Sequence, residues 1–225
     1  NTINGNVSMF SGNGDTIVTS TSGQLTFNGN FTATTTGRNL RLEGNGNGVI
    51  SGVISNGATA NLNVTKNSAG TWTLSGANSY TGVTTVAAGT LIISGSIDAS
   101  DATVQNGATL GGNGNLGGSL TVQSGAHHAL AVAATPEAQV TRTITGALNL
   151  EAGNLLDLSA SATPAPGSYV LVTATGGITG DLGTVNQASI PGTVSISGNS
   201  IVLNISSAAG FSAWIGGFSV ADAST

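Results

Sequence analysis

The chain has 225 residues, 35 of them glycine, with 6% charged residues and a formal net charge of −5. Four Lys and Arg residues are too few for a nucleic-acid interface, which typically neutralises about six to ten phosphates, and the absence of cysteine excludes disulfides and cysteine-based metal sites. A hydrophobic fraction of 39% with so little charge argues against a disordered chain, and the glycines lack the three-residue period of collagen.

Short runs that alternate apolar and polar residues predict strands along nearly the whole chain. In chain order the predicted strands are 6–10, 16–19, 24–27, 40–42, 49–54, 61–65, 71–74, 84–86, 91–93, 102–104, 109–110, 119–122, 143–150, 155–158, 169–173, 193–196 and 201–205. Asn-Gly and Gly-Asn steps separate many of them and predict corners. Residues 131–145 and 163–167 break the pattern and are expected to bulge out as loops. No apolar run approaches the roughly 18 residues of a membrane helix.

A sandwich and a solenoid could both accommodate so many short strands. A sandwich needs hairpins between strands of about five or six residues, and the runs here are shorter. Similar phrases recur at 106–110, 118–122 and 146–150, a spacing that suits coils of about 20 to 30 residues. We therefore predict an all-β fold, a single elongated parallel β-solenoid of about eight to ten coils.

One close pair of acids is the strongest candidate for chemistry. Asp98 and Asp101 could form a calcium site or an acid/base pair. A polysaccharide-active enzyme would need further acids and basic residues to converge on them, and Lys66 and Arg142 have no evident partners in the sequence. We therefore interpret both aspartates as ordinary solvated corner residues.

The adjacent histidines His127 and His128 cannot both bind one metal from a single strand, because neighbouring strand residues point to opposite faces. We expect them in a surface turn. The glycine-rich stretch 111–118 is not followed by a helix, so a phosphate-binding loop is excluded. The sequence predicts no catalytic residue, no metal ligand and no cofactor.

Asparagines at the corners could stack into hydrogen-bonded ladders between coils. The candidates are Asn13, Asn28, Asn45, Asn56 and Asn106. The exposed faces of Thr, Asn and Ser could also contact a cell-surface or matrix polysaccharide, although few aromatic residues are available for stacking on sugars.

The two ends of the predicted solenoid, 1–207, would each leave a row of backbone groups open for association. The pattern predicts a strand from the first residues of the chain, and this segment contains Ile3, Val7 and Phe10. The short apolar segment 208–225 has helical spacing and acts either as a cap on its own last coil or as a dock for the next subunit. Its apolar stripe consists of Phe211, Trp214, Ile215 and Phe218.

Residues 62–94 resemble the autotransporter-associated β-strand repeat of large secreted bacterial proteins. The residues that carry the resemblance are Lys66, Gly70, Thr71, Leu74, Gly76, Asn78, Tyr80, Gly82, Gly89 and Leu91. Trp72 stands where the family usually has Leu or another strand former. The resemblance implies a right-handed β-helical passenger or stalk on the bacterial cell surface, with a structural or adhesive role and no chemistry. No autotransporter barrel follows in this sequence.

Three functions remain open. The first is a non-enzymatic extracellular subunit that stacks head-to-tail into a surface filament or stalk for adhesion or biofilm matrix, because a head-to-tail contact does not close. The second is a monomeric passenger fragment of an autotransporter-like adhesin. The third is a polysaccharide-active enzyme that would use Asp98 and Asp101.

Overall fold

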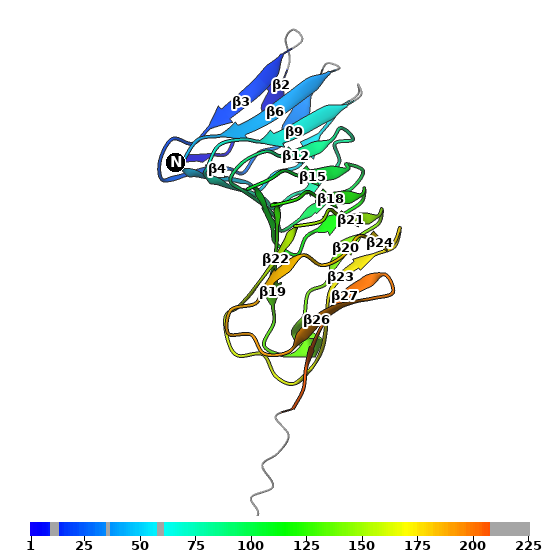
Figure 1. Cartoon of the computed structure of the whole chain (residues 1–225). Coiled ribbons are helices and arrows are strands. Elements are labelled where there is room, and N and C mark those ends of the chain that lie inside the picture. The colour runs from blue at the N-terminus through cyan, green and yellow to red at the C-terminus, as the bar shows by residue number, and fades with distance from the viewer. Residues whose placement is uncertain (10–13, 35–36, 58–60, 208–225) are drawn as a thin grey trace, which may run out of the picture.

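The chain winds through three parallel sheets in a repeating order (Figure 1). The computed structural model describes residues 1–9, 14–34, 37–57 and 61–207. We call three consecutive strands, one in each sheet, a coil. Within the described residues, eight such coils are stacked, and each takes about 18 to 29 residues. This arrangement confirms the predicted all-β, parallel solenoid.

The first sheet contains β1 (Thr2–Ile3), β4 (Gln24–Phe27), β7 (Asn47–Ile50), β10 (Thr71–Leu74), β13 (Thr90–Ile93), β16 (Thr109–Gly111), β19 (His127–Val132), β22 (Leu155–Ala160) and β25 (Thr184–Asn186). The second sheet has two parts. The first part is β2 (Val7–Met9), β5 (Phe31–Ala33) and β8 (Ile54–Ser55), and the second part is β11 (Ala77–Asn78), β14 (Ser96–Ile97), β17 (Asn115–Leu116), β20 (Arg142–Ile144), β23 (Gly167–Ala174), β27 (Ser200–Ile205) and β26 (Thr193–Ser197). The third sheet contains β3 (Asp15–Thr19), β6 (Arg38–Glu43), β9 (Leu62–Lys66), β12 (Thr84–Val86), β15 (Ala102–Val104), β18 (Leu120–Val122), β21 (Leu148–Leu150) and β24 (Ile178–Thr179).

The alternation in the sequence sets which side chains fill the core. Successive strand residues point to opposite faces, so every second residue faces the interior. Equivalent positions stack in register from coil to coil, as Leu91 does on Leu110 and Ile97 on Leu116. All four of these side chains are buried. The intervening Thr and Asn residues face outward, which explains how a chain with few charges presents a polar surface.

The predicted interruption at residues 131–145 is partly confirmed. Strand β19 continues to Val132, and the chain then leaves the coil through a short 3-10 helix, η1 (Pro136–Ala138), before β20 begins at Arg142. Among the described residues this is the only helical element, and none is long and apolar enough to cross a membrane.

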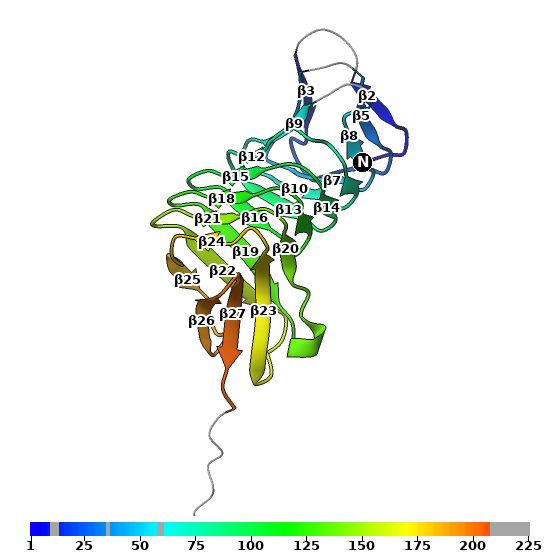
Figure 2. The same ribbon diagram turned by 90° about the vertical axis from the view of Figure 1, so that its right-hand side faces the viewer.

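The C-terminal end departs from the uniform parallel coil. Strands β26 and β27 form an antiparallel hairpin, and β27 also pairs antiparallel with β23 (Figure 2). Two reversals leave β26 running in the same direction as β23. The second sheet therefore extends two strands beyond β23, whereas the third sheet ends at β24. The half-buried Val194 and Ile196 of β26 pack against the core.

The N-terminal end has no comparable cover in the described residues. Strands β1, β2 and β3 are terminal members of their sheets. Ile3 pairs in register with the buried Phe27, yet it is 43% exposed. Val7 is half-buried. Of the other predicted interface residues, Phe10, Phe211, Trp214, Ile215 and Phe218 lie outside the described residues.

Candidate functional site: the polar face of the third sheet

The outward face of the third sheet carries two aligned rows of polar side chains. The first row begins with Asp15, Asn39 and Asn63, which are register partners on β3, β6 and β9. The second row begins with Arg41 on β6 and continues with threonines: Thr65, Thr85, Thr103 and Thr121. Parallel strands lie about 4.8 Å apart, so each row repeats at that interval along the long axis.

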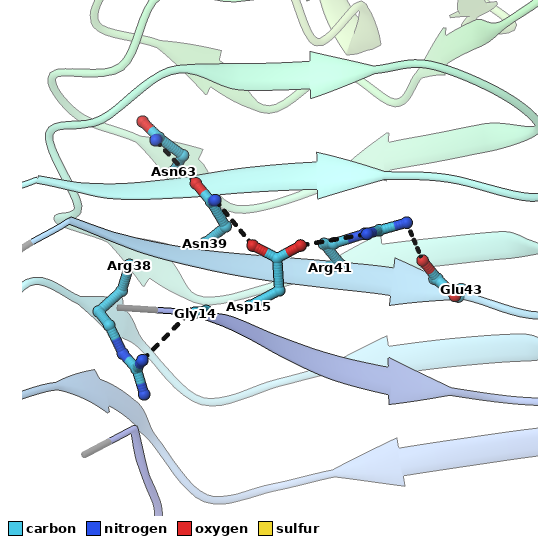
Figure 3. Close-up of polar contacts among 7 residues, drawn as sticks. All are labelled: Gly14, Asp15, Arg38, Asn39, Arg41, Glu43 and Asn63. Carbon is cyan, nitrogen blue, oxygen red and sulfur yellow. Dashed lines mark hydrogen bonds and ion pairs between the residues drawn. The ribbon is translucent and has the colours of Figure 1, made fainter. Parts of the chain in front are cut away.

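The first row is held by side-chain hydrogen bonds (Figure 3). The Asn63 Nδ2 donates to Asn39 Oδ1 at 2.8 Å, and the Asn39 Nδ2 donates to Asp15 Oδ1 at 2.8 Å. The backbone N–H of Val83 in turn donates to Asn63 Oδ1 at 2.9 Å. Each amide thus has a fixed orientation.

At the start of this face, the single positive charge of Arg41 is shared by two carboxylates. Arg41 lies 3.1 Å from Asp15 Oδ2 and 2.6 Å from Glu43 Oε1 (Figure 3). The pKa of Asp15 is lowered mainly by the hydrogen bond that it accepts from Asn39 and secondly by the one from Arg41. The hydrogen bond to Asp15 raises the pKa of Arg41. All three side chains are partly exposed, so salt screens these pairs.

A shallow hollow of about 350 Å³ lies between the rows. It is lined by Asp15, Asn39, Arg41, Asn63, Thr65, Asn67, Val83 and Ala87. Val83 is 53% exposed and supplies an apolar wall. The hollow therefore combines amides, a hydroxyl, an apolar contact and the paired charges of Asp15 and Arg41.

Three of the four basic residues are buried and bind backbone carbonyls. The Lys66 Nζ donates to Ser68 O at 2.6 Å, to Ala88 O at 3.0 Å and to Asn67 O at 3.3 Å, and so joins its own corner to the next coil. Burial lowers the pKa of Lys66 to about 8, and Glu43 partly opposes this shift. Arg38 donates from Nη1 to Gly14 O at 3.0 Å (Figure 3).

Arg142 is the corresponding clamp between later coils. It is fully buried and donates through Nη2 to the carbonyl oxygens of Gly111 and Gly112. Its Nη1 lies 3.1 Å from His128 Nε2. Burial lowers the pKa of Arg142 to about 9. The pKa of His128 lies well below its usual value, mainly because the ring is buried and secondly because Arg142 is positively charged. Sequence reasoning missed these partners because backbone carbonyls leave no residue signature.

The predicted surface turn at the histidines is wrong, because both lie in strand β19. The reason for excluding a shared metal is nevertheless confirmed, since they point to opposite faces. His127 lies outside, with Nδ1 2.6 Å from Asp157 Oδ2, and His128 is buried beside Arg142. No group of three or more His, Cys, Asp or Glu that could hold a metal occurs in the described part of the chain.

The two aspartates of the candidate acid pair serve separate corners. Asp98 Oδ1 accepts a hydrogen bond from Ser96 Oγ at 2.8 Å, and Asp101 Oδ1 accepts one from the Ser119 N–H at 2.7 Å. These are the turn contacts expected of corner residues.

Three of the corner asparagines bond to the neighbouring coil, as the sequence suggested, but among the described residues only Asn28 has another asparagine as its partner. Asn28 donates to Asn4 Oδ1 at 2.7 Å, Asn56 to Thr81 Oγ1 at 2.7 Å and Asn106 to Ser124 O at 2.9 Å. Asn13 lies outside the described residues. A longer series of side-chain bonds forms from Asn39 and Asn63, which lie within strands.

The quoted repeat residues occupy one coil and its neighbours. The buried Asn78 accepts from the Ile54 N–H at 2.9 Å and donates to Gly76 O and Ser96 O, both at 2.9 Å. The buried Tyr80 hydroxyl lies 2.8 Å from Thr84 Oγ1. Gly89 has a φ of +67°, which favours glycine. Asn78 therefore ties three successive coils together, whereas Tyr80 and Gly89 shape corners.

Comparison with known families decides what this coil is similar to. Residues 64–93 match the family model described as the passenger-associated-transport-repeat. The match confirms the resemblance inferred from the sequence. A comparison with curated proteins gave no match. The repeat and the stacked parallel strands together fit a β-helix like those of autotransporter passenger domains.

Proposed function

We propose that this chain is a non-enzymatic structural segment that acts as a rigid stalk on a bacterial cell surface. The observation that carries the proposal is the in-register stack of coils around a continuous apolar core. Such a stack holds its two ends at a fixed separation, which is what a stalk must do. The match to the passenger-associated repeat supports secretion and surface display.

The polar clusters also support a structural role. Lys66 and Arg142 are committed to backbone carbonyls inside the coil, and Asp98 and Asp101 hold separate corners. Catalysis of polysaccharide cleavage needs carboxyl groups that converge on one bond. In the described residues, the two carboxylates that do lie near each other, Asp15 and Glu43, are both paired with Arg41. The repeat family to which 64–93 is similar is generally non-enzymatic.

Head-to-tail assembly into a filament for adhesion or biofilm matrix is the second candidate. The open strands β1, β2 and β3, with Ile3 43% exposed, favour it. At the other end, β24, β25 and β26 each run in the same direction as the earlier parallel strands of their own sheet. However, the second sheet extends two strands past the third sheet's last coil, so the two ends are stepped differently. The first coil of one subunit therefore cannot pair along all three sheets with the last coil of another unless the β26–β27 hairpin rearranges. For this reason we rank the stalk first.

Negative-stain electron microscopy of the purified chain, with and without residues 208–225, tests both candidates. Short rods of one length in both samples are expected for the stalk. Long fibres that disappear on deletion would replace the stalk with the filament. Compact round particles would contradict both.

A further inference from the structure

We propose that the outward face of the third sheet, around β6, β9, β12 and β15, binds a segment of an uncharged polysaccharide. We call this surface the threonine face and define it by Thr65, Thr85 and Thr103 together with Asn67. The inference goes beyond the stalk role, because a rigid spacer needs no ligand. It also names residues for the polysaccharide contact that the composition only suggested.

The hydroxyl row supplies hydrogen-bonding groups that the protein itself does not use. Thr65, Thr85 and Thr103 are register partners on three consecutive strands. In the described part of the chain their hydroxyls make no hydrogen bond, and neither does the side-chain amide of Asn67. By contrast, Thr121 Oγ1 in the same row accepts from Asn149 Nδ2 at 3.4 Å. Among the described residues, the row Thr71, Thr90 and Thr109 on the first sheet also has unused hydroxyls. The threonine face differs from that row because it borders a hollow.

The hollow gives these groups a shape into which a sugar fits. Its volume of about 350 Å³ falls in the range of small-ligand sites. Ala87 leaves room above the sheet, and the exposed Val83 offers an apolar surface to the C–H face of a pyranose ring. Thr65 and Asn67 border the same hollow and present a donor and acceptors to sugar hydroxyls.

The orientation of the neighbouring groups is fixed before a ligand arrives. Asn39 and Asn63 are locked by their mutual hydrogen bond and by the Val83 N–H. The strand backbone fixes the spacing of the threonines, whose χ1 angles are restricted by β-branching. Little conformational entropy is therefore lost on binding, which partly offsets the lack of aromatic stacking.

The charge on this face favours an uncharged chain. Arg41 is already paired with Asp15 and Glu43, and no other basic side chain borders the hollow. A polyuronic acid or a nucleic acid would find no free cation there. Because the threonine row runs along the long axis, a bound polysaccharide would follow that axis across successive coils.

The test is a titration of the full chain with cellohexaose and chitohexaose, followed by NMR shifts of the Thr and Val methyl groups. We expect shifts at Thr65, Thr85 and Thr103 and at Val83, and no shifts with an oligouronate of the same length. Absence of shifts at millimolar oligosaccharide, or shifts confined to other surfaces, would overturn the proposal.

A variant pair gives a second readout. The triple substitution Thr65→Val, Thr85→Val and Thr103→Val keeps the β-branched shape and removes the three hydroxyls. We expect it to weaken binding at least tenfold. The matched control is Thr71→Val, Thr90→Val and Thr109→Val, an equivalent outward row on the first sheet. Equal binding by both triple variants would disprove the assignment, whereas the methyl shifts of the native chain decide it if either variant fails to fold.

Discussion

The indole ring of Trp72 packs directly on Gly48, its register partner on the neighbouring strand. A Cβ atom placed on Gly48 would lie 2.3 Å from the ring. Trp72 is fully buried, and its Nε1 donates to Glu43 O at 3.2 Å. The core therefore accommodates a large ring in one coil because the coil before it provides no side chain at that position.

Replacing Gly48 with alanine should destabilise the fold by about 1 to 3 kcal/mol, because the added methyl group forces the indole out of its packed position. Urea unfolding followed by circular dichroism measures the change in midpoint. Gly111→Ala is the matched control in the same sheet, since its Cβ would meet only an ordinary contact at 3.5 Å. Equal midpoints for the two variants would contradict this packing.

Replacing Arg142 with methionine should lower the free energy of unfolding by about 1 to 3 kcal/mol, because buried carbonyl acceptors on Gly111 and Gly112 lose their donor. Arg41→Met provides the comparison, since Arg41 forms only partly exposed ion pairs. Thermal unfolding of both variants measures the difference. A loss for Arg41→Met as large as that for Arg142→Met would show that the buried clamp contributes no more than partly exposed ion pairs do.

The stability contributed by Lys66 should depend on alkaline pH. Burial lowers its pKa to about 8 from 10.5, so the folded protein releases this proton before the unfolded chain does. The free energy of unfolding should therefore rise with pH between these values, by at most about 1.4 kcal/mol per pH unit. Urea midpoints of the native chain and of Lys66→Met, compared from pH 7 to 10, isolate this effect. A difference that stays flat or shrinks would refute it.

Much of the fold could be predicted because its signals are local. Alternation and Asn-Gly corners located most strands, and the repeated phrases indicated stacking. Opposite orientation of His127 and His128 followed from strand geometry alone. The turn predicted there was wrong. Two adjacent polar residues interrupt the apolar pattern and so resemble a turn, and the sequence does not show that the buried His128 has Arg142 as its partner.

The parts that sequence did not show depend on contacts between distant coils. Lys66 and Arg142 have carbonyl partners, which any residue can provide. The ladder of Asn39 and Asn63 depends on register, since these residues become neighbours only when β6 and β9 pair. Likewise, the antiparallel direction of β27 is decided by pairing with β23, because a strand pattern is the same in either direction.

The hairpin of β26 and β27 also indicates at which end of the molecule folding begins. Ser197 pairs with Ser200, whereas each parallel pairing must close a loop of about 18 residues or more. Short loops close at lower entropic cost, so we expect this hairpin to be the seed on which β23 and then the earlier coils are laid, from the C-terminal side toward β1. Pulse-labelled hydrogen exchange during refolding should protect β27 before β4; the opposite order would place the seed elsewhere. The solenoid would then fold by the addition of one coil at a time, with the open edge of each completed coil serving as the template for the next.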